Sequence, residues 1–148
     1  MATQTYRPSW SQRWANRVLT QLVRRGRGPA FIRLLTVTGR VTGRPHSTPV
    51  VPVQRDEDLW LVSPFGEVGW VCNVRATHRL ELRRGGDRTT YEARELDATE
   101  AVPVLRTYLS MPSERFVRRD FDITSGSSDE AIAGEAPRHP VFALTPVA

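Results

Sequence analysis

Apolar residues recur at every fourth position near the start of the chain. Trp10, Trp14, Val18 and Leu22 follow this spacing, and arginines occupy much of the remaining helical wheel. The pattern predicts an amphipathic helix that ends at Gly26. We expect this helix to pack its tryptophans on the domain, and the alternative is that it lies on a membrane surface.

Alternating and β-branched runs follow, separated by turns that are rich in glycine and charge. They predict strands over residues 31–38, 46–54, 59–63, 79–84, 89–96 and 141–144. Pro49 and Pro52 remove hydrogen-bond donors from the second run, so we expect it at a sheet edge or with a bulge. Helical segments are expected over residues 67–76, 97–109 and 111–121. Pro103 is expected in the first turn of the second of these helices, where proline is tolerated.

Short turns join most neighbouring strands, which favours an antiparallel sheet closed as a small barrel over a parallel βαβ sheet. We therefore expect a mainly β (α+β) fold, a small antiparallel barrel of about six strands with an N-terminal amphipathic helix and inserted helices. The length of 148 residues suits a single domain, residues 1–148, with a basic helix over 1–28 and the barrel over 29–148.

All 21 basic residues are arginines, and the formal net charge is +5. A guanidinium suits bidentate binding of phosphate or carboxylate, whereas the lack of lysine excludes Schiff-base chemistry. The charge favours an acidic partner such as nucleic acid, an anionic cofactor or a membrane surface. The single cysteine, Cys72, excludes an internal disulfide, and residues 1–6 lack the apolar core of a signal peptide. We therefore expect a cytoplasmic protein.

The first candidate site is the turn Gly39-Arg40-Val41-Thr42-Gly43-Arg44, called here the 39–44 turn. It lies between predicted strands and lacks the Gly-Lys-Ser/Thr ending, so it is neither a P-loop nor a dinucleotide fingerprint. Turn glycines can still expose consecutive backbone N–H groups as an anion-binding nest, to which Arg40 and Arg44 add charge. The alternative is an ordinary hairpin turn with solvated arginines.

The second candidate site is Ser63-Pro64-Phe65-Gly66, called here the 63–66 turn, which is followed by Trp70, Asn73 and Arg75. Trp70 and Asn73 are three residues apart and share a helix face. An indole in this place can border a flat ring, and an amide can orient a polar tail. The alternative is that Trp70 anchors the core and Asn73 caps the helix.

Other kinds of site find less support in the sequence. The three histidines, His46, His78 and His139, are scattered, so no metal site is predicted. Cys72 lacks a CxxC partner, and no Gly-x-Ser-x-Gly elbow is present, so no protein nucleophile is predicted. The arginine pairs occur without a zinc, helix-turn-helix or RNP pattern, so no nucleic-acid partner is expected.

Five segments together resemble one known family. They are Leu35-Thr36-Val37-Thr38 with the 39–44 turn and Pro45, Thr48 and Pro49; residues 61–67; residues 70–76; residues 83–86; and residues 137–142. Over residues 31–147 the chain resembles the deazaflavin-dependent nitroreductase and quinone reductase family of actinobacteria. The resemblance implies a split β-barrel of the flavin-reductase-like superfamily, and the deazaflavin coenzyme F420 with its phosphodiester and oligoglutamate tail.

The same resemblance implies an oxidoreductase, in which the reduced coenzyme passes a hydride to an electrophilic small molecule such as a quinone, an enone or a nitro compound. By position, the 39–44 turn holds the phosphate, the 63–66 turn offers backbone donors to the ring edge, and Arg75 adds positive charge. The implied coenzyme-binding residues are Gly39, Arg40, Val41, Thr42, Gly43, Arg44, Thr48, Pro49, Val51, Ser63, Pro64, Phe65, Gly66, Trp70, Asn73 and Arg75. Speculative proton donors besides solvent are Tyr6, Tyr108 and Ser110, and Arg13 and Arg17 are weaker candidates for contact with the glutamate tail.

Two positions depart from the pattern of that family. Val41 stands where members often carry lysine, and Cys72 stands where they often carry arginine, so both remove charge beside the expected phosphate. Arg44 and Arg75 are candidates to compensate. Two alternatives stay open: an FMN-binding protein of the flavin-reductase kind, and a non-catalytic deazaflavin-binding module. The expected partner is a small-molecule electron acceptor, the protein is expected as a monomer or homodimer, and peripheral membrane contact through the N-terminal helix is a further alternative.

Overall fold

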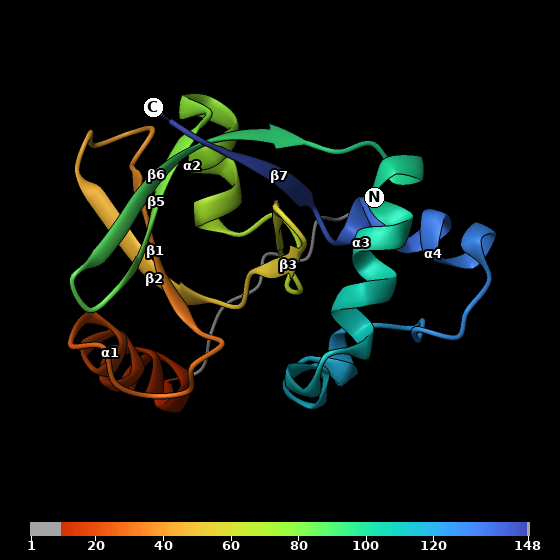
Figure 1. The fold of residues 1–148 in the computed structure, drawn as a ribbon, viewed down its shortest axis with the longest axis horizontal. Coiled ribbons are helices and arrows are strands. Elements are labelled where there is room, and N and C mark those ends of the chain that lie inside the picture. Colours follow the sequence, from red (N-terminus) through yellow and green to blue (C-terminus); the bar gives the residue numbers. More distant parts are fainter. Residues whose placement is uncertain (1–9, 148) are drawn as a thin grey trace.

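A single curled antiparallel sheet of seven strands organises residues 10–147, the part of the chain that the computed structural model describes (Figure 1). The strands are β1 (Arg33–Thr38), β2 (Pro45–Val50), β3 (Val53–Arg55), β4 (Asp58–Val62), β5 (Arg79–Arg84), β6 (Asp87–Glu95) and β7 (Val141–Pro146). Their order across the sheet is β2-β1-β5-β6-β7-β4-β3. Every neighbouring pair is antiparallel, which confirms the predicted fold class.

The strand count differs from the prediction because residues 46–54 form two strands. β2 pairs with β1 at one edge of the sheet, whereas β3 pairs with β4 at the opposite edge. Pro52 lies between them and has no amide N–H to continue a ladder. The chain therefore passes from one edge to the other within a few residues, and both halves of the predicted strand are edge strands.

Four α-helices and three short 3-10 helices accompany the sheet. They are α1 (Trp10–Arg24), α2 (Gly69–Thr77), α3 (Ala98–Ser110), α4 (Asp129–Glu135), η1 (Pro112–Phe116), η2 (Arg118–Asp120) and η3 (Ala136–Arg138). Helix α1 packs on β1, β2 and β5, whereas α3 packs on α4, β3 and β4 at the other end of the sheet (Figure 1). Between residues 10 and 147 the structure contains no helix with the length and apolarity needed to cross a bilayer.

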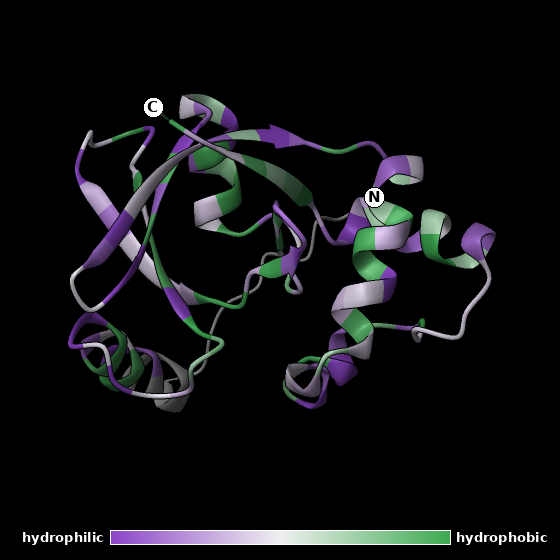
Figure 2. Ribbon diagram, viewed as in Figure 1, coloured by the Kyte–Doolittle hydropathy of each residue, from purple (hydrophilic) through white to green (hydrophobic). Residues whose placement is uncertain are grey.

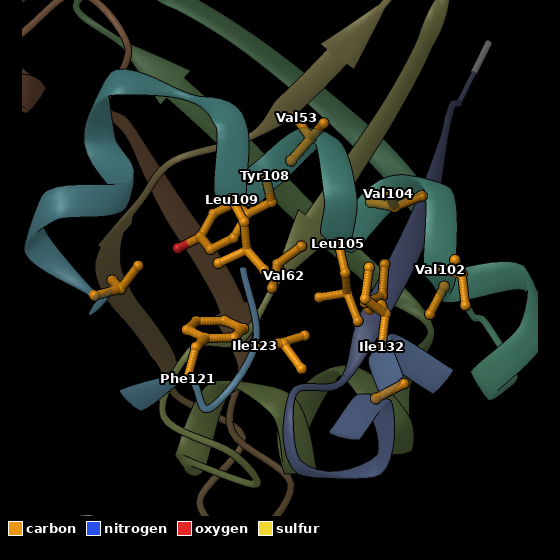
Figure 3. Close-up of a cluster of buried hydrophobic side chains, with 14 residues drawn as sticks. Val53, Val62, Val102, Val104, Leu105, Tyr108, Leu109, Phe121, Ile123 and Ile132 are labelled. Carbon is orange, nitrogen blue, oxygen red and sulfur yellow. The ribbon is translucent and has the colours of Figure 1, made fainter. Parts of the chain in front are cut away.

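Three apolar clusters form the core. The first lies inside the curl of the sheet against α2 and includes Leu35, Val71 and Phe142. The second lies between α3, α4 and the β3–β4 edge, and Figure 3 shows its side chains converging from these elements. The third lies beneath α1 and contains Val23, Ile32 and Leu34. Figure 2 shows hydrophobic and hydrophilic residues sharing both α1 and α3, as expected for helices that bury one face.

The last turns of α1 bury a residue that lies outside the predicted apolar stripe. Val23 is fully buried, whereas Val18 and Leu22 are 42% and 37% exposed. The end of the helix is fixed by the β5–β6 hairpin, because the Gly85 amide donates to the Val23 carbonyl at 3.0 Å. This contact sets the rotation of the last turn. The side chains of residues 10–15 lie outside the described part, so the packing of the two tryptophans stays a prediction.

Helix α3 begins as predicted, but its proline lies deeper than predicted. Asp97 caps the helix: its carboxylate accepts from the Glu100 amide at 2.8 Å, and the Glu100 carboxylate accepts from the Asp97 amide at 3.2 Å. This capping box makes Ala98 the first helical residue. Pro103 consequently lies inside the helix and not in its first turn, which corrects the expectation.

Candidate functional site

The 39–44 turn connects β1 to β2 and is closed by two backbone hydrogen bonds. The Gly39 amide donates to the Arg44 carbonyl at 2.8 Å, and the Gly43 amide donates to the Gly39 carbonyl at 3.0 Å. A Cβ atom on Gly39 would lie 2.7 Å from His46 Nε2, and Gly43 has a φ of +71°. The positive φ of Gly43 favours glycine, whereas a side chain at Gly39 would have to displace the exposed His46 imidazole and would lie 3.1 Å from the Arg44 carbonyl.

Two backbone donors at the tip of this turn are available to a ligand. The amides of Val41 and Thr42 have no partner within residues 10–147, and Val41 is 84% exposed. The amides on either side are used, because the Arg40 amide donates to Asn73 Oδ1 at 3.1 Å and the Gly43 amide donates to the Gly39 carbonyl at 3.0 Å. The turn thus presents a nest of two consecutive N–H groups, and other backbone amides of the turn already donate hydrogen bonds within the protein.

Asn73 holds Arg40 at the base of the turn. Asn73 lies on α2 and is 6% exposed. Its Oδ1 accepts from the Arg40 amide at 3.1 Å and from Arg40 Nη1 at 2.7 Å, across 33 positions of sequence. No carboxylate in the described part pairs with Arg40 or with Arg44, so both positive charges remain available to an anion.

The 63–66 turn joins β4 to α2 and is closed by its own side chain. Ser63 is fully buried, and its hydroxyl donates to the Gly66 carbonyl at 2.6 Å. Gly66 has a φ of +83°, and its carbonyl also accepts from the Val68 amide at 2.9 Å. The Ser63 hydroxyl is therefore occupied within the turn, whereas the Gly66 amide has no partner in the described part.

Trp70 belongs to the core inside the sheet. Its ring packs against Phe142 with centroids 5.8 Å apart and planes tilted by 54°. It is partly buried against the same cluster as Leu35 and Val71. This arrangement favours the core-anchor alternative for Trp70. Asn73, three residues further along α2, braces Arg40 and does not cap the helix.

Arg75 is engaged by two carboxylates. Its Nε and Nη2 donate to the two oxygens of Glu95 at 2.8 Å each, and Nη1 donates to Glu67 Oε1 at 3.1 Å. Hydrogen bonding to Glu95 raises the pKa of Arg75 above its ordinary value. Little of the Arg75 charge is left for an anionic ligand, because three of its N–H groups and two opposite charges are already matched.

Thr48 and Pro49 lie on opposite faces of β2, and Val51 lies beyond the strand, although the family resemblance implies that all three line a slot for the coenzyme ring. Thr48 pairs with Leu35, whose side chain fills the inside of the curl, whereas Pro49 pairs with Leu34, which is buried beneath α1. Val51 packs on the same α1 cluster as Leu34. Successive strand residues point to opposite faces, so the side chains of Thr48 and Pro49 do not share one slot.

The candidate proton donors do not meet the two turns in the described structure. Tyr108 is 4% exposed and packs 6.0 Å from Phe121 in the α3–α4 cluster (Figure 3). Burial raises the pKa of Tyr108, which makes it a weaker acid. Ser110 is exposed, and its hydroxyl donates to the Thr107 carbonyl at 2.7 Å. Tyr6 and the side chain of Arg13 lie outside the described residues, and Arg17 is exposed on α1.

A buried histidine–glutamate pair beside the 63–66 turn was missed by the sequence reasoning. His139 Nδ1 lies 3.0 Å from the Pro64 carbonyl, and His139 Nε2 lies 2.9 Å from Glu135 Oε2. The two residues are 2% and 6% exposed. The sequence signal for the pair is their spacing of four positions, but their contact with Pro64 spans 75 positions and is purely tertiary.

Comparison with known proteins gives a family and a fold. The family described as F420H2-dependent quinone reductase matches residues 10–119. No curated protein matches the sequence.

Solved structures resemble the chain at low sequence identity. One described as a domain-swapped dimer has 20% identity and a TM-score of 0.57, with 92% of this chain and 97% of that chain covered. An F420-H2 dependent reductase, FDR-A, has 20% identity and a TM-score of 0.55, with coverages of 78% and 95%. A pyridoxamine 5'-phosphate oxidase-related, FMN binding protein from Nostoc punctiforme has 12% identity and a TM-score of 0.55, with coverages of 88% and 78%. These likenesses show the split-barrel fold of flavin-reductase-like proteins.

Proposed function

Because this chain belongs to the F420H2-dependent quinone reductase family, an oxidoreductase family that uses the deazaflavin coenzyme F420, we propose that the 39–44 turn binds the phosphate of that coenzyme. The observation that supports this most directly is the Arg40–Asn73 contact. It orients a guanidinium without neutralising it, next to two consecutive amides that lack partners. A phosphate oxygen needs N–H donors and positive charge, and the turn supplies both.

The charge around the 39–44 turn sets how strongly we expect it to bind the phosphate. Arg40 and Arg44 are unpaired by carboxylates in the described part, whereas Arg75 is paired with Glu67 and Glu95. Val41 and Cys72 contribute no charge. We therefore assign the phosphate to Arg40, with Arg44 adding long-range attraction, and expect a weaker site than one that has additional cations.

The 63–66 turn supports the placement of the coenzyme ring beside the same helix. The turn leads directly into α2, and α2 carries Asn73. The free Gly66 amide offers a donor to a ring oxygen or nitrogen. We propose that the two turns, each joined to α2, serve one ligand that has an anionic group and a polar ring edge.

The coenzyme, when bound, supplies the hydride, and the residues of this chain bind and orient it. We propose an electrophilic small molecule as the acceptor, in the class of quinones, enones or nitro compounds. We assign the proton that the product needs to solvent, because Tyr108 lies in the core and its pKa is raised by burial.

A turnover assay tests this function. The purified protein is mixed with reduced F420 and with each member of a panel that contains a naphthoquinone, a cyclic enone and a nitroaromatic compound, and coenzyme oxidation is followed by absorbance. The expected result is oxidation that depends on both protein and acceptor, with reduced FMN as a poor substitute. Tight coenzyme binding without turnover across the panel contradicts the proposal and favours a non-catalytic binding module.

A further inference from the structure

The 63–66 turn contacts a buried network of residues near the C-terminal end of the chain, centred on His139. His139 follows η3 and contacts the Pro64 carbonyl through Nδ1 at 3.0 Å and Glu135 Oε2 through Nε2 at 2.9 Å. Its ring stacks on Phe121, with centroids 3.8 Å apart and an angle of 20° between the planes. Both ring nitrogens and one ring face are thus engaged, so the orientation of the imidazole is fixed.

The acceptors around the His139 ring favour hydrogens on both ring nitrogens. A carbonyl oxygen only accepts, so Nδ1 must carry a hydrogen to bond Pro64. Glu135 accepts from the Asp122 amide with both carboxylate oxygens, at 3.1 and 3.2 Å, as an ionised carboxylate does. Nε2 must then also carry a hydrogen to bond Glu135. With Glu135 ionised, a doubly protonated imidazolium satisfies all of these contacts.

Loss of one proton leaves a single ring hydrogen and two acceptors. A hydrogen bond to a carboxylate is roughly twice as strong as one to a neutral carbonyl. The neutral ring therefore keeps its hydrogen on Nε2, toward Glu135, and Nδ1 loses its donor function toward Pro64. Within the described residues the Pro64 carbonyl has no other partner, so deprotonation releases it.

The contact of His139 with the Pro64 carbonyl restrains the middle of the 63–66 turn, which we propose to contact the coenzyme. The turn is also held by the Ser63 amide, which donates to the Pro140 carbonyl at 2.9 Å, and by the Ser63 hydroxyl, which donates to the Gly66 carbonyl at 2.6 Å. The Phe65 side chain packs on the α3–α4 cluster. Helix α2 begins just beyond, after Val68, which provides no side-chain cap. The middle of the turn therefore helps to set where α2 begins and, through α2, where Asn73 meets Arg40.

We propose that His139 is a positioning residue of the coenzyme site, whose doubly protonated ring, held by Glu135, fixes the 63–66 turn through the Pro64 carbonyl and makes coenzyme affinity fall as pH rises. This inference rests on the proposed function, because it takes the 63–66 turn to contact the coenzyme.

Burial and the charges around the His139 ring set the pH range over which the ring loses its proton. Glu135 on α4 favours the protonated ring, whereas the positive charge of Arg138 opposes it. Asp120 on η2 also faces His139, and Asp122 pairs with Arg138 at 3.1 Å. Burial is the largest influence and lowers the pKa of His139 below its ordinary value. The change in coenzyme affinity is therefore expected on the acidic side of about 6.5, the ordinary pKa of histidine.

Two substitutions of His139 distinguish the role of Nδ1 from the role of Nε2. In His139→Asn the side-chain amide nitrogen takes the place of Nδ1 and can donate to Pro64, whereas in His139→Gln it takes the place of Nε2 and can reach only Glu135. Both variants remove the ring stack on Phe121 and the titration. His78→Asn, which removes an exposed histidine, is the control.

The first readout is the Kd of oxidised F420 between pH 5 and pH 8. We expect the wild type and His78→Asn to weaken roughly three- to tenfold with rising pH, as for the loss of one hydrogen bond. His139→Asn is expected to bind tightly at every pH, and His139→Gln weakly at every pH. Equal affinities of the two His139 variants, or an unchanged pH profile in His139→Asn, overturn the inference.

The second readout is backbone hydrogen exchange of residues 63–68 in protein without coenzyme. Faster exchange in His139→Gln than in His139→Asn supports the attachment of the turn by His139, and equal exchange in the two overturns it. If the wild type binds no coenzyme, the proposed function fails. The hydrogen-exchange comparison then tests whether His139 holds the 63–66 turn, independently of coenzyme binding.

Discussion

Asn73 Oδ1 accepts two hydrogen bonds from Arg40, one from its backbone amide at 3.1 Å and one from its guanidinium at 2.7 Å. A neutral acceptor thus fixes a cation that a carboxylate would have neutralised. The contact joins the 39–44 turn to α2, and α2 also follows the 63–66 turn. The account of coenzyme binding depends on this junction.

Replacing Asn73 with aspartate tests whether the neutral acceptor matters. Asn73→Asp keeps an oxygen acceptor in place but adds a negative charge beside Arg40. We expect coenzyme affinity to fall about tenfold, because the pair then resembles a satisfied salt bridge and repels a phosphate. Titration with oxidised F420 measures this, and a melting curve checks that the fold persists. Wild-type affinity in a folded Asn73→Asp protein would exclude Arg40 as the phosphate ligand.

Removal of Arg75 is expected to leave coenzyme affinity within about twofold of wild type, because Glu67 and Glu95 already engage its guanidinium. Stability should fall by no more than about 1 kcal/mol in urea unfolding, since these partly exposed ion pairs are screened by solvent. The variant is Arg75→Ala. A tenfold or greater loss of affinity would instead support the expectation from the sequence that Arg75 binds the coenzyme.

Gly66→Ala should destabilise the protein by about 1 kcal/mol, because a residue with a Cβ atom resists the φ of +83° at this position. The added methyl would lie 3.5 Å from the Arg138 carbonyl, so conformation and not a clash is the cause. Gly69→Ala is the matched control, since Gly69 begins α2, has an ordinary φ and has open space around it. Chemical unfolding of the two variants checks the difference. Equal stabilities would show that the 63–66 turn adapts to a side chain.

Stability should depend on pH through His139. Because burial lowers the pKa of His139 in the folded state, the unfolded chain binds this proton at a higher pH than the native protein does. The free energy of unfolding is therefore expected to fall as pH drops below about 6.5, and this part of the slope should vanish in His139→Asn. Urea unfolding between pH 5.5 and pH 7.5 measures it, with His78→Asn as the control. A slope that His139→Asn leaves unchanged would assign the titration to other groups.

Local sequence patterns predicted the elements of this fold well where the determinants are local. The alternation of residues 79–84 and 89–96 around Gly85 and Gly86 predicted the β5–β6 hairpin, and the helix predicted over residues 97–109 is found as α3. The division of residues 46–54 between two sheet edges was not predicted, because it depends on which distant strand each half pairs with.

The burial of Val23 in the last turn of α1 was not predicted for a similar reason. A spacing of four residues drifts around the helix, and the Val23 side chain is buried against Ile32 and Leu34, which come from elsewhere in the chain. Sequence periodicity indicates that a helix has an apolar side, but the partner decides which residues of that side are covered.

In the candidate site, too, local features could be predicted from the sequence, whereas long-range contacts could not. The glycines of the 39–44 turn could be identified because their conformational freedom is a property of single residues. The contacts that give the turn its chemistry join residues far apart in sequence, such as Arg40 with Asn73 and Arg75 with Glu95. The contact of His139 with Pro64 depends in addition on burial, which one isolated histidine in a sequence does not reveal.

The most direct test of the central claim is a fluorescence titration of wild type, Arg40→Ala and Arg88→Ala with oxidised F420. Arg88 is an exposed arginine on β6, near the β5–β6 hairpin and at the far end of the sheet from the 39–44 turn, so it controls for loss of net charge. The account predicts that Arg40→Ala weakens binding by about 1.5–3 kcal/mol, roughly 10- to 150-fold, whereas Arg88→Ala binds like wild type. Equal affinity of Arg40→Ala and wild type would contradict the assignment of the 39–44 turn as the phosphate site.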